Sequence, residues 1–219
     1  MAYQTRFLDY ARNDRVGGRN DKAVIRRWVK GNKDMTRQEI EVKARARDLE
    51  AVAQKLHDLG CTVSEPREQD DAIFINFVGS YIEFRSGAKA NFLRIRKTNG
   101  KNIFTIKQAQ TNELDVIEYE TEIADAEQMR QALLLMGYRE VMRIRKVRRK
   151  ANYRDYEICL DDVDGLGSYV EAEKISEGAD SQLVQQELLN FLVTLGIKPE
   201  DREEHGYDTL LYLRQIKVA

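Results

Sequence analysis

Glu39, Glu41 and Lys43 are residues whose types and spacing could perform chemistry. Side chains alternate between the two faces of an extended strand, so these three share one face, and Ile40 and Val42 share the other. Carboxylates at this spacing can hold a hard divalent cation, and a lysine beside them can neutralise a phosphoryl oxygen. One such strand also resembles an ordinary solvated sheet face. The case for a site therefore depends on whether the pattern recurs.

The same alternation does recur in later segments, with both signs of charge. Its charged members are Arg94, Arg96, Lys107, Glu118, Glu120, Glu122, Lys146, Arg148, Glu157, Asp161, Glu171 and Glu173. Burying so many charges is prohibitive unless they pair with one another or hold a ligand. A polyphosphate with a divalent metal meets that need, because Arg and Lys bind phosphoryl oxygens and carboxylates bind Mg²⁺. The sequence contains neither a P-loop nor a GxGxxG phosphate cradle.

The remaining composition narrows the chemistry. His57 and His205 have no His or Cys partner at ligand spacing, which argues against zinc and favours Mg²⁺ or Mn²⁺ held by carboxylates. Cys61 and Cys159 lie far apart in the sequence, as expected for reduced thiols in a cytosolic protein. No apolar run approaches the length of a membrane span, and the first residues lack the apolar core of a signal peptide. We therefore expect a cytoplasmic protein with no membrane partner.

Strands and helices alternate along the chain after residue 35. The expected strands are Arg37–Ala46, Asp71–Val78, Asn91–Lys97, Asn102–Gln108, Asp115–Ile123, Glu140–Arg149, Tyr153–Leu160 and a strand around 169–173. The expected helices are 48–59 and 125–136, each opened by an aspartate, one capped by Ser181, and a last one around Tyr207–Ile216. Asn99-Gly100 predicts a hairpin, and 161–167 reads as a turn-rich link.

Two architectures fit these elements. An antiparallel sheet closed into a barrel would pack its apolar faces outward on helices and line a lumen with charge. An open sheet with helices on one face and a solvated charged face fits the composition equally well. The need to satisfy both signs of charge favours the closed α+β barrel.

Residues 1–34 differ from the rest of the chain. They carry nine Lys/Arg and four Asp/Glu, a net of +5, within a protein of formal net charge −1. They show no sustained periodicity, so we expect a disordered basic extension ahead of one domain over 35–219. A nucleic-acid contact through 1–34 and the basic run 143–150 is the alternative, and the overall charge gives it no support.

The charged motifs, taken in order, resemble the CYTH superfamily of triphosphate tunnel metalloenzymes. Glu39-x-Glu41-x-Lys43 is similar to the family's ExExK signature. The motifs that follow are Asp71-x-x-Phe74, Leu93-Arg94-Ile95-Arg96, Thr105-x-Lys107, Glu120-x-Glu122, Lys146-x-Arg148, Asp161-x-Val163-x-Gly165-Leu166-Gly167 and Glu171-x-Glu173. The resemblance covers roughly 36–215 and implies an eight-stranded antiparallel barrel whose lumen binds triphosphate and Mg²⁺ or Mn²⁺. Gly206-Tyr207-Asp208 looks like the closing segment of the cyclase-like branch, with Gly206 standing where a serine is expected.

The resemblance also implies roles for individual residues. Those expected to grip the triphosphate are Arg94, Arg96, Lys107, Lys146 and Arg148. Those expected to carry metal are Glu39, Glu41, Asp161, Glu171 and Glu173, with Glu41 and Glu173 as direct ligands. Lys43 would orient carboxylates or the nucleophile, which makes Lys43, Glu41 and Glu173 the expected catalytic residues. Glu120 and Glu122 either bind a second metal or balance the basic residues.

Two reactions fit such a site. In one, the 3′-hydroxyl of ATP attacks the α-phosphorus and pyrophosphate leaves, giving cyclic AMP; in the other, water attacks the γ-phosphorus and phosphate leaves. The resemblance over the whole domain favours a class IV-type adenylyl cyclase, with hydrolysis of inorganic triphosphate, thiamine triphosphate or a nucleoside triphosphate as the alternative. A polyphosphate binder without catalysis is a third hypothesis. The resemblance also allows a homodimer.

Overall fold

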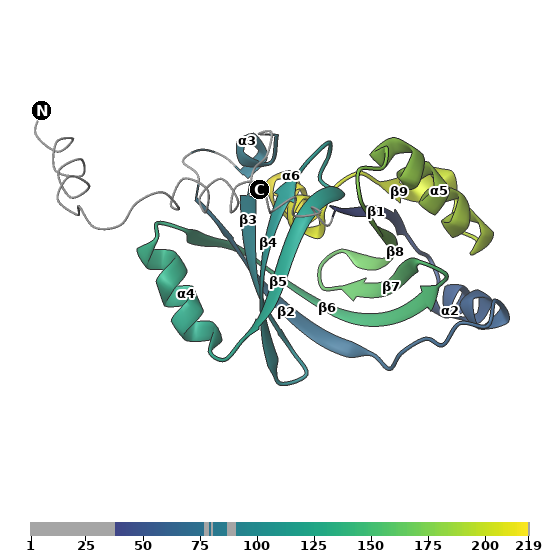
Figure 1. Ribbon diagram of the computed structural model, residues 1–219, viewed down its shortest axis with the longest axis horizontal. Coiled ribbons are helices and arrows are strands. Elements are labelled where there is room, and N and C mark those ends of the chain that lie inside the picture. Colours follow the sequence, from purple (N-terminus) through teal and green to yellow (C-terminus); the bar gives the residue numbers. More distant parts are fainter. Residues whose placement is uncertain (1–37, 77–78, 80, 87–90, 219) are drawn as a thin grey trace, which may run out of the picture. The chain divides into compact units, whose positions relative to one another are not determined.

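An antiparallel β-sheet that closes on itself organises the protein (Figure 1). The computed structural model describes residues 38–76, 79, 81–86 and 91–218 of the 219-residue chain. Within this part, the order of neighbouring strands is β5-β4-β3-β2-β6-β7-β8-β1-β9, and a further β5–β1 pairing closes the first eight strands into a barrel. The closed α+β barrel expected from the sequence is confirmed, and the open-sheet alternative is wrong.

The strands follow the alternation of charged and apolar residues. Their bounds are β1 Gln38–Arg45, β2 Arg67–Ile75, β3 Asn91–Thr98, β4 Lys101–Ala109, β5 Asp115–Ile123, β6 Arg139–Tyr153, β7 Tyr156–Val163, β8 Gly167–Ser176 and the two-residue β9 Arg202–Glu203. Asn99 and Gly100 connect β3 to β4 with positive φ angles of 47° and 73°. Asn-Gly tolerates this left-handed turn, which matches the twist of the flanking strands, so the predicted hairpin forms.

The helices surround the barrel. Their bounds are α2 Leu49–Asp58, α3 Tyr81–Ser86, α4 Ala126–Leu135, α5 Ser181–Thr194 and α6 Tyr207–Val218, with a short 3₁₀ turn at Pro199–Asp201. Asp48 caps α2 and Asp125 caps α4, each accepting hydrogen bonds from two backbone N–H groups, as the sequence predicts. The cap of α5 is Asp180 rather than Ser181. Among the described residues, no helix combines the length and the apolar composition needed to cross a membrane.

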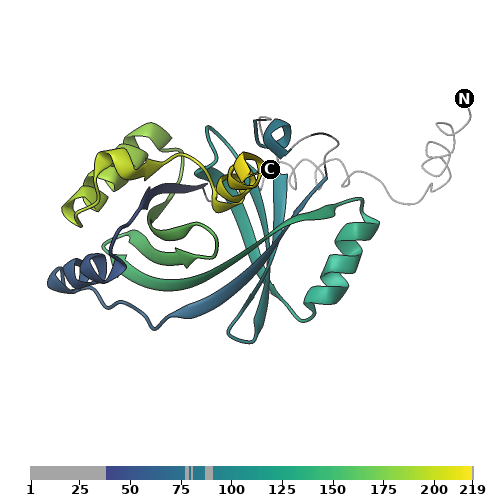
Figure 2. The same ribbon diagram turned by 180° about the vertical axis from the view of Figure 1, so that it is seen from behind.

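The apolar faces of the strands pack outward on helices, as expected. Ile40, Val42, Ile158 and Val170 belong to a core cluster completed by residues of α2 and α5. A second cluster joins β2 and β3 to α4. Figures 1 and 2 show α4 on one side of the strands and α2 and α5 on the other. This outward packing leaves the opposite face of each strand for the lumen.

A third apolar cluster closes one end of the barrel. Phe92, Ile144 and Tyr169 from the strands meet Tyr81 of α3 and Tyr207 of α6. Both ribbon views place α3 and α6 near this end, away from α4 (Figures 1 and 2). The sequence did not predict α3, and its position gives the lumen one blocked end.

The seam of the barrel is short. β1 pairs with β5 only over Gln38–Ile40, and the amide of Glu41 donates to the carbonyl of Leu114 at 2.8 Å. The β1–β8 ladder on the other edge of β1 includes eight residue pairs. Farther along its seam edge, β1 pairs with β9 through Lys43 and Ala44. Closure of the barrel therefore depends on a small number of backbone hydrogen bonds.

Some predicted bounds differ from those observed. The expected turn-rich link 161–167 begins too early, because β7 continues to Val163 in register with β6 and β8. The strand β6 extends to Tyr153, so the strand predicted at Tyr153–Leu160 forms three residues later, as β7 from Tyr156 to Val163. The end of the expected strand Asp71–Val78 and the predicted extension 1–34 lie outside the described residues.

Candidate active site

Two connected chambers occupy the lumen. The deep chamber has a volume of about 90 Å³, and the mouth chamber has a volume of about 340 Å³. Both are lined by Glu39, Arg94, Lys107, Arg148 and Glu173, which therefore mark where they meet. Of the other predicted site residues, the deep chamber adds Glu41, Lys43, Lys146 and Glu171, and the mouth chamber adds Arg96 and Glu120. The structure thus brings most of the predicted set together.

Three carboxylates converge beside this junction. Glu39, Glu41 and Glu173 each offer an oxygen, and these atoms all lie within 4.8 Å of one another. Cross-strand pairing places Glu41 directly opposite Glu173. Burial, followed by repulsion from Glu171, raises the pKa of Glu41 to about 7, and burial together with Glu39 raises the pKa of Glu173 well above its usual range. Crowded carboxylates that resist ionisation are the donor set that a hard divalent cation would satisfy.

Glu39 differs from its two neighbours. Its carboxylate lies 2.8 Å from the Lys107 ammonium. Burial alone would raise the pKa of Glu39, but Lys107 and Arg94 outweigh burial and lower it. Glu39 is therefore ionised without a metal, whereas burial and neighbouring carboxylates disfavour the ionised forms of Glu41 and Glu173. The acidic group of Glu39, Glu41 and Glu173 is called the carboxylate triad below.

Lys43 lies in the deep chamber between Glu41 of the triad and Glu171. Its ammonium lies 2.9 Å from Glu41 and 3.0 Å from Glu171, and 4.2 Å above the centre of the Tyr207 ring. Burial opposes its charge, but the Glu171 and Glu41 carboxylates outweigh burial and raise the pKa of Lys43. Lys43 therefore remains protonated, which suits the orientation of carboxylates rather than proton abstraction.

A group around Arg148 is matched in charge. The Arg148 guanidinium binds Asp161 through two nitrogens, one at 2.7 Å, and also binds Glu171. Tyr207 donates to Asp161 at 2.9 Å, and Lys146 lies 3.5 Å from the same carboxylate. Burial opposes ionisation of Asp161 and Glu171, but Arg148 with Lys146 or Lys43 lowers the pKa of each carboxyl group. Asp161 and Glu171, both expected to carry metal, thus contact cations and lie outside the carboxylate triad.

Lys146 is the member of this group whose ammonium is least stabilised. Burial and the neighbouring Arg148 lower the pKa of Lys146 to about 8, despite the carboxylates nearby. A further anion in the lumen would restore its full charge. This behaviour fits the predicted role of Lys146 in binding a polyphosphate.

Two arginines and Lys107 surround the junction from β3 and β4. Arg94 donates to Thr105 at 3.0 Å and to Glu120 at 3.2 Å, while its buried Nε donates to no acceptor among the described residues. Arg96 is held by both oxygens of Asp71 at 2.7 Å. Lys107 contacts Glu39 and Glu118. The unpaired Arg94 Nε is a donor that an anionic ligand in the lumen could satisfy.

The two carboxylates assigned to a second metal or to charge balance lie apart from the triad. Glu120 is 44% exposed and accepts hydrogen bonds from Arg94 and Thr105. Glu122 pairs with Lys101 at 2.8 Å and lines neither chamber. Their contacts in the structure are those of charge balance.

Cys159 completes a second group with Glu157 and Glu173. The ligand atoms of these three residues also lie within 4.8 Å of one another. Cys159 is fully buried, and burial raises the pKa of its thiol well above the usual range. The sulfur is therefore a protonated thiol at neutral pH, which makes the carboxylate triad the better site for Mg²⁺ or Mn²⁺.

The blocked end contains functional neighbours that the sequence did not assign. Arg85 lies 2.9 Å from Glu113 and 3.5 Å from Asp208, and Tyr81 donates to Asp208. A Cβ on Gly206 would lie 2.3 Å from the Asp208 carboxylate, so glycine leaves room for this network where a serine was expected. Asp71 and Tyr207 belong to motifs that are visible in the sequence. Only the structure shows that Asp71 holds Arg96 and that Tyr207 donates a hydrogen bond to Asp161.

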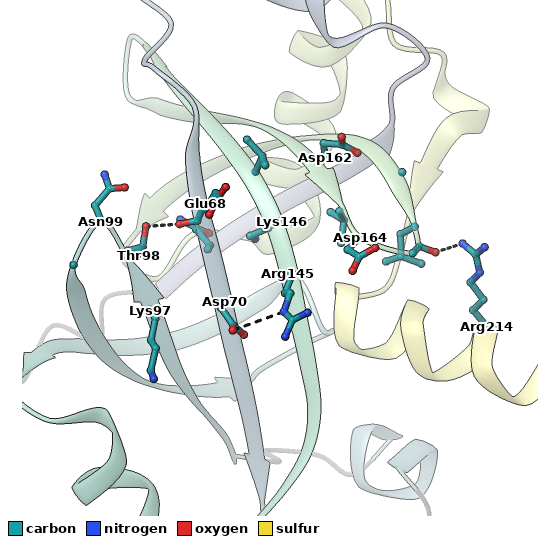
Figure 3. Close-up of a pocket in the computed structure, with 17 residues that line it drawn as sticks. Glu68, Asp70, Lys97, Thr98, Asn99, Arg145, Lys146, Asp162, Asp164 and Arg214 are labelled. Carbon is teal, nitrogen blue, oxygen red and sulfur yellow. Dashed lines mark hydrogen bonds and ion pairs between the residues drawn. The ribbon is translucent and has the colours of Figure 1, made fainter.

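A larger cavity than either chamber, of about 980 Å³, lies elsewhere, between β2, β6, the β3–β4 hairpin and the β7–β8 turn (Figure 3). Figure 3 shows Asp70 and Arg145 facing each other there, with Arg214 of α6 extending toward the β7–β8 turn. Asp70 lies 3.5 Å from Arg143 and 3.8 Å from Arg145. The charges of this groove belong to both signs, and its lining includes none of the carboxylate triad. Its size therefore does not make it the better candidate for phosphoryl chemistry.

Known proteins resemble this chain in sequence and in fold. A protein from Methanocaldococcus jannaschii named "Putative adenylate cyclase MJ0240" is 34% identical over 172 residues, which span 77% of this chain and 95% of that protein. The solved structure of PH1012 from Pyrococcus horikoshii OT3 is 25% identical, with a TM-score of 0.65 over 77% of this chain and 96% of that one.

A third comparison is more distant. The structure of HpAC1 from Hippeastrum, described as having a dominant triphosphatase activity, is 19% identical, with a TM-score of 0.53 over 78% of this chain and 91% of that one.

The CYTH domain model matches residues 37–207, which include every predicted site residue and all eight strands of the barrel. This chain belongs to the CYTH family.

Proposed function

We propose that this protein is a metal-dependent adenylyl cyclase of the class IV type, which converts ATP to cyclic AMP and pyrophosphate inside the barrel. CYTH proteins are enzymes that act as adenylyl cyclases or triphosphatases. The observation that carries the proposal is the junction of the two chambers, where the carboxylate triad meets Arg94, Lys107 and Arg148. The cyclase name of the M. jannaschii relative supports the choice of reaction.

The carboxylate triad would hold Mg²⁺ or Mn²⁺. All its donors are carboxylate oxygens, the ligands these hard cations prefer, and in Glu41 and Glu173 burial and neighbouring carboxylates outweigh the nearby cations and disfavour the ionised form. When bound, the metal would neutralise phosphoryl oxygens and favour ionisation of the attacking hydroxyl. Lys43 would keep Glu41 in place, since its ammonium contacts both Glu41 and Glu171.

The basic residues would bind and orient the triphosphate. Arg94 offers an unpaired Nε, and Lys146 gains charge when an anion approaches. Lys107 and Arg148 lie at the same junction, so the phosphoryl groups would be held next to the triad. The 3′-hydroxyl would then attack the α-phosphorus in line, and the basic residues would stabilise the charge that develops on the leaving pyrophosphate.

Hydrolysis of a triphosphate is the second candidate. The described activity of the Hippeastrum protein keeps it open, because a dominant triphosphatase shares this fold. In that reaction the same cations would bind the chain of phosphates, and water would attack the γ-phosphorus. The two reactions differ in which phosphorus lies beside the triad.

One product analysis separates the candidates. The purified protein is incubated with Mn²⁺ or Mg²⁺ and, in parallel, with ATP, inorganic triphosphate and thiamine triphosphate. We expect cyclic AMP and pyrophosphate to form in equal amounts from ATP, with loss of turnover in Glu41→Gln and full turnover in Glu122→Gln, whose side chain lies outside both chambers. Formation of ADP and phosphate without cyclic AMP would establish the triphosphatase instead.

A further inference from the structure

One apolar side chain interrupts the charged lining of the mouth chamber. Ten of the eleven residues that line it are charged, and the eleventh is Ile175. Ile175 is 43% exposed, so a large part of its apolar side chain is in contact with solvent beside charged neighbours. An apolar surface at such a position can contact the apolar part of a ligand whose other part is ionic.

The strand β8 directs Ile175 into the lumen. Ile175 shares a face with Glu171 and Glu173, both of which line the chambers. Lys174 points the other way, to Asp155 at 3.0 Å and Glu187 at 3.4 Å. The β7–β8 ladder ends at the pair Glu157–Glu173, so Ile175 lies beyond it, with Glu39 of β1 as its cross-strand partner. It therefore stands at the rim, one step outward from the carboxylate triad.

The blocked end fixes the direction in which a substrate would extend. Beyond the junction, the deep chamber measures about 90 Å³ and ends on Tyr207, Asp208 and Arg85. The mouth chamber is about 340 Å³, within the range of small-molecule pockets. Within the part of the barrel that the structure describes, a triphosphate bound at the junction therefore has room for an attached organic group only toward the mouth.

Neighbouring charges leave the organic group little else to contact. Lys150 is paired with Glu157, and Arg96 is held by both oxygens of Asp71. These pairs already satisfy one another, whereas the exposed surface of Ile175 gains by being covered.

We propose that Ile175 is a specificity-determining residue that packs against the ring-bearing organic group of an ester triphosphate and so favours it over inorganic triphosphate. This inference rests on the proposed function, because it takes the triphosphate to be bound at the junction. In this role Ile175 affects which triphosphate is bound, and it contributes no charge to the reaction. Both a purine nucleotide and thiamine triphosphate present such a ring, and the test below distinguishes them.

The test measures binding and turnover in Ile175→Asn. Titration calorimetry with Mn²⁺ gives the affinities for ATP, thiamine triphosphate and inorganic triphosphate, and steady-state kinetics gives kcat/KM for each. Loss of the apolar contact should weaken binding of the ring-bearing ligand about tenfold and leave inorganic triphosphate within twofold of wild type. The ester with the larger loss identifies which ring the mouth prefers.

Two further variants keep the result interpretable. Ile216→Asn makes the same change at an exposed isoleucine of α6, 54% exposed and outside the chambers, and should change neither affinity. Ile175→Val retains an apolar surface and should restore most of the selectivity.

Equal losses for ester and inorganic triphosphate, or no loss for either, would overturn the role of Ile175 while the proposed function stands. If the wild-type protein binds neither kind of triphosphate, the proposed function fails first and the inference falls with it. Selective binding without turnover would leave the inference supported and remove the cyclase.

Discussion

Glu171 and Glu173 are two residues apart on β8 and face the same lumen, yet their environments are opposite. Glu171 contacts Lys43 at 3.0 Å and Arg148, and these cations lower its pKa well below the usual range. Glu173 lies beside Glu39 and Glu41, and burial with this repulsion raises its pKa well above the usual range. The same type of side chain on the same strand is thus an ionised counter-ion at one position and a carboxyl group whose ionisation is disfavoured at the other.

This contrast separates two functions of buried charge. A buried charge that is matched, as around Arg148, holds the barrel together, and removing one partner leaves the other unpaired. A buried carboxyl group whose ionised form is disfavoured, as in Glu41 and Glu173, makes the metal-free protein less stable at neutral pH, and binding of a cation would offset that loss. The comparison predicts that mutations in the two groups will change stability in opposite directions.

Asp161→Ala should have the largest effect on folding. Asp161 is fully buried and contacts Arg148, Lys146 and Tyr207, so its removal leaves a buried guanidinium short of a partner. We expect the free energy of unfolding to fall by about 3–5 kcal/mol in a urea titration. Asp161→Asn, which keeps an acceptor, should lose less. A loss below about 1 kcal/mol for the alanine variant would show that the Arg148 group is not structural.

The pH dependence of stability should report Glu41. Its pKa is about 7 in the folded protein and 4.5 when unperturbed, so its contribution is fully present below 4.5 and is lost as the pH rises through 7. In a chelating buffer, wild type should lose about 3 kcal/mol relative to Glu41→Gln between pH 4.5 and 7.5. Saturating Mg²⁺ should reduce this loss, because the metal stabilises the ionised carboxylate. Parallel stability curves for the two proteins would contradict the assignment.

Glu171→Gln and Glu173→Gln form the closest matched pair and should give the smallest changes. The first removes a charge that Arg148 and Lys43 require, and should lower the free energy of unfolding by about 2 kcal/mol. The second removes a disfavoured charge, and should raise it by about 1 kcal/mol in metal-free buffer. Chemical denaturation measures both, and manganese titration should show lost binding only in Glu173→Gln. Changes of the same sign would remove the distinction between the two groups.

The sequence predicted the faces of the strands but not their partners. Alternation correctly placed Glu39, Glu41 and Lys43 together, and the same parity placed Glu171 with Glu173. Parity alone is identical for Glu171 and Glu173; the difference arises from register, which sets Lys43 opposite Glu171 and Glu41 opposite Glu173. Register between strands that are distant in sequence is a tertiary property. The alternation of residues along one strand therefore could not show that Asp161 and Glu171 pair with Arg148, apart from the carboxylate triad.

The bounds that sequence reasoning missed have local causes. The run from Asp161 to Gly167 is rich in turn-forming residues, yet pairing with β6 and β8 keeps Asp161 within a strand. Asp180 and Ser181 are both good cap residues, and only the structure shows which side chain accepts from the helix amides. The six residues of α3 are too few to display a helical period, so the blocked end of the lumen could not be foreseen.

The short seam of the barrel has a kinetic consequence. Separating β1 from β5 breaks three residue pairs, whereas separating β1 from β8 breaks eight. We therefore expect local opening to begin at this seam, with the amide hydrogens of Gln38–Ile40 exchanging with solvent sooner than those of the other lumen strands. The Lys107–Glu39 ion pair reaches from β4 to β1 across this line. A ligand that engages both side chains raises the free energy of opening, so occupancy of the lumen and closure of the wall reinforce each other.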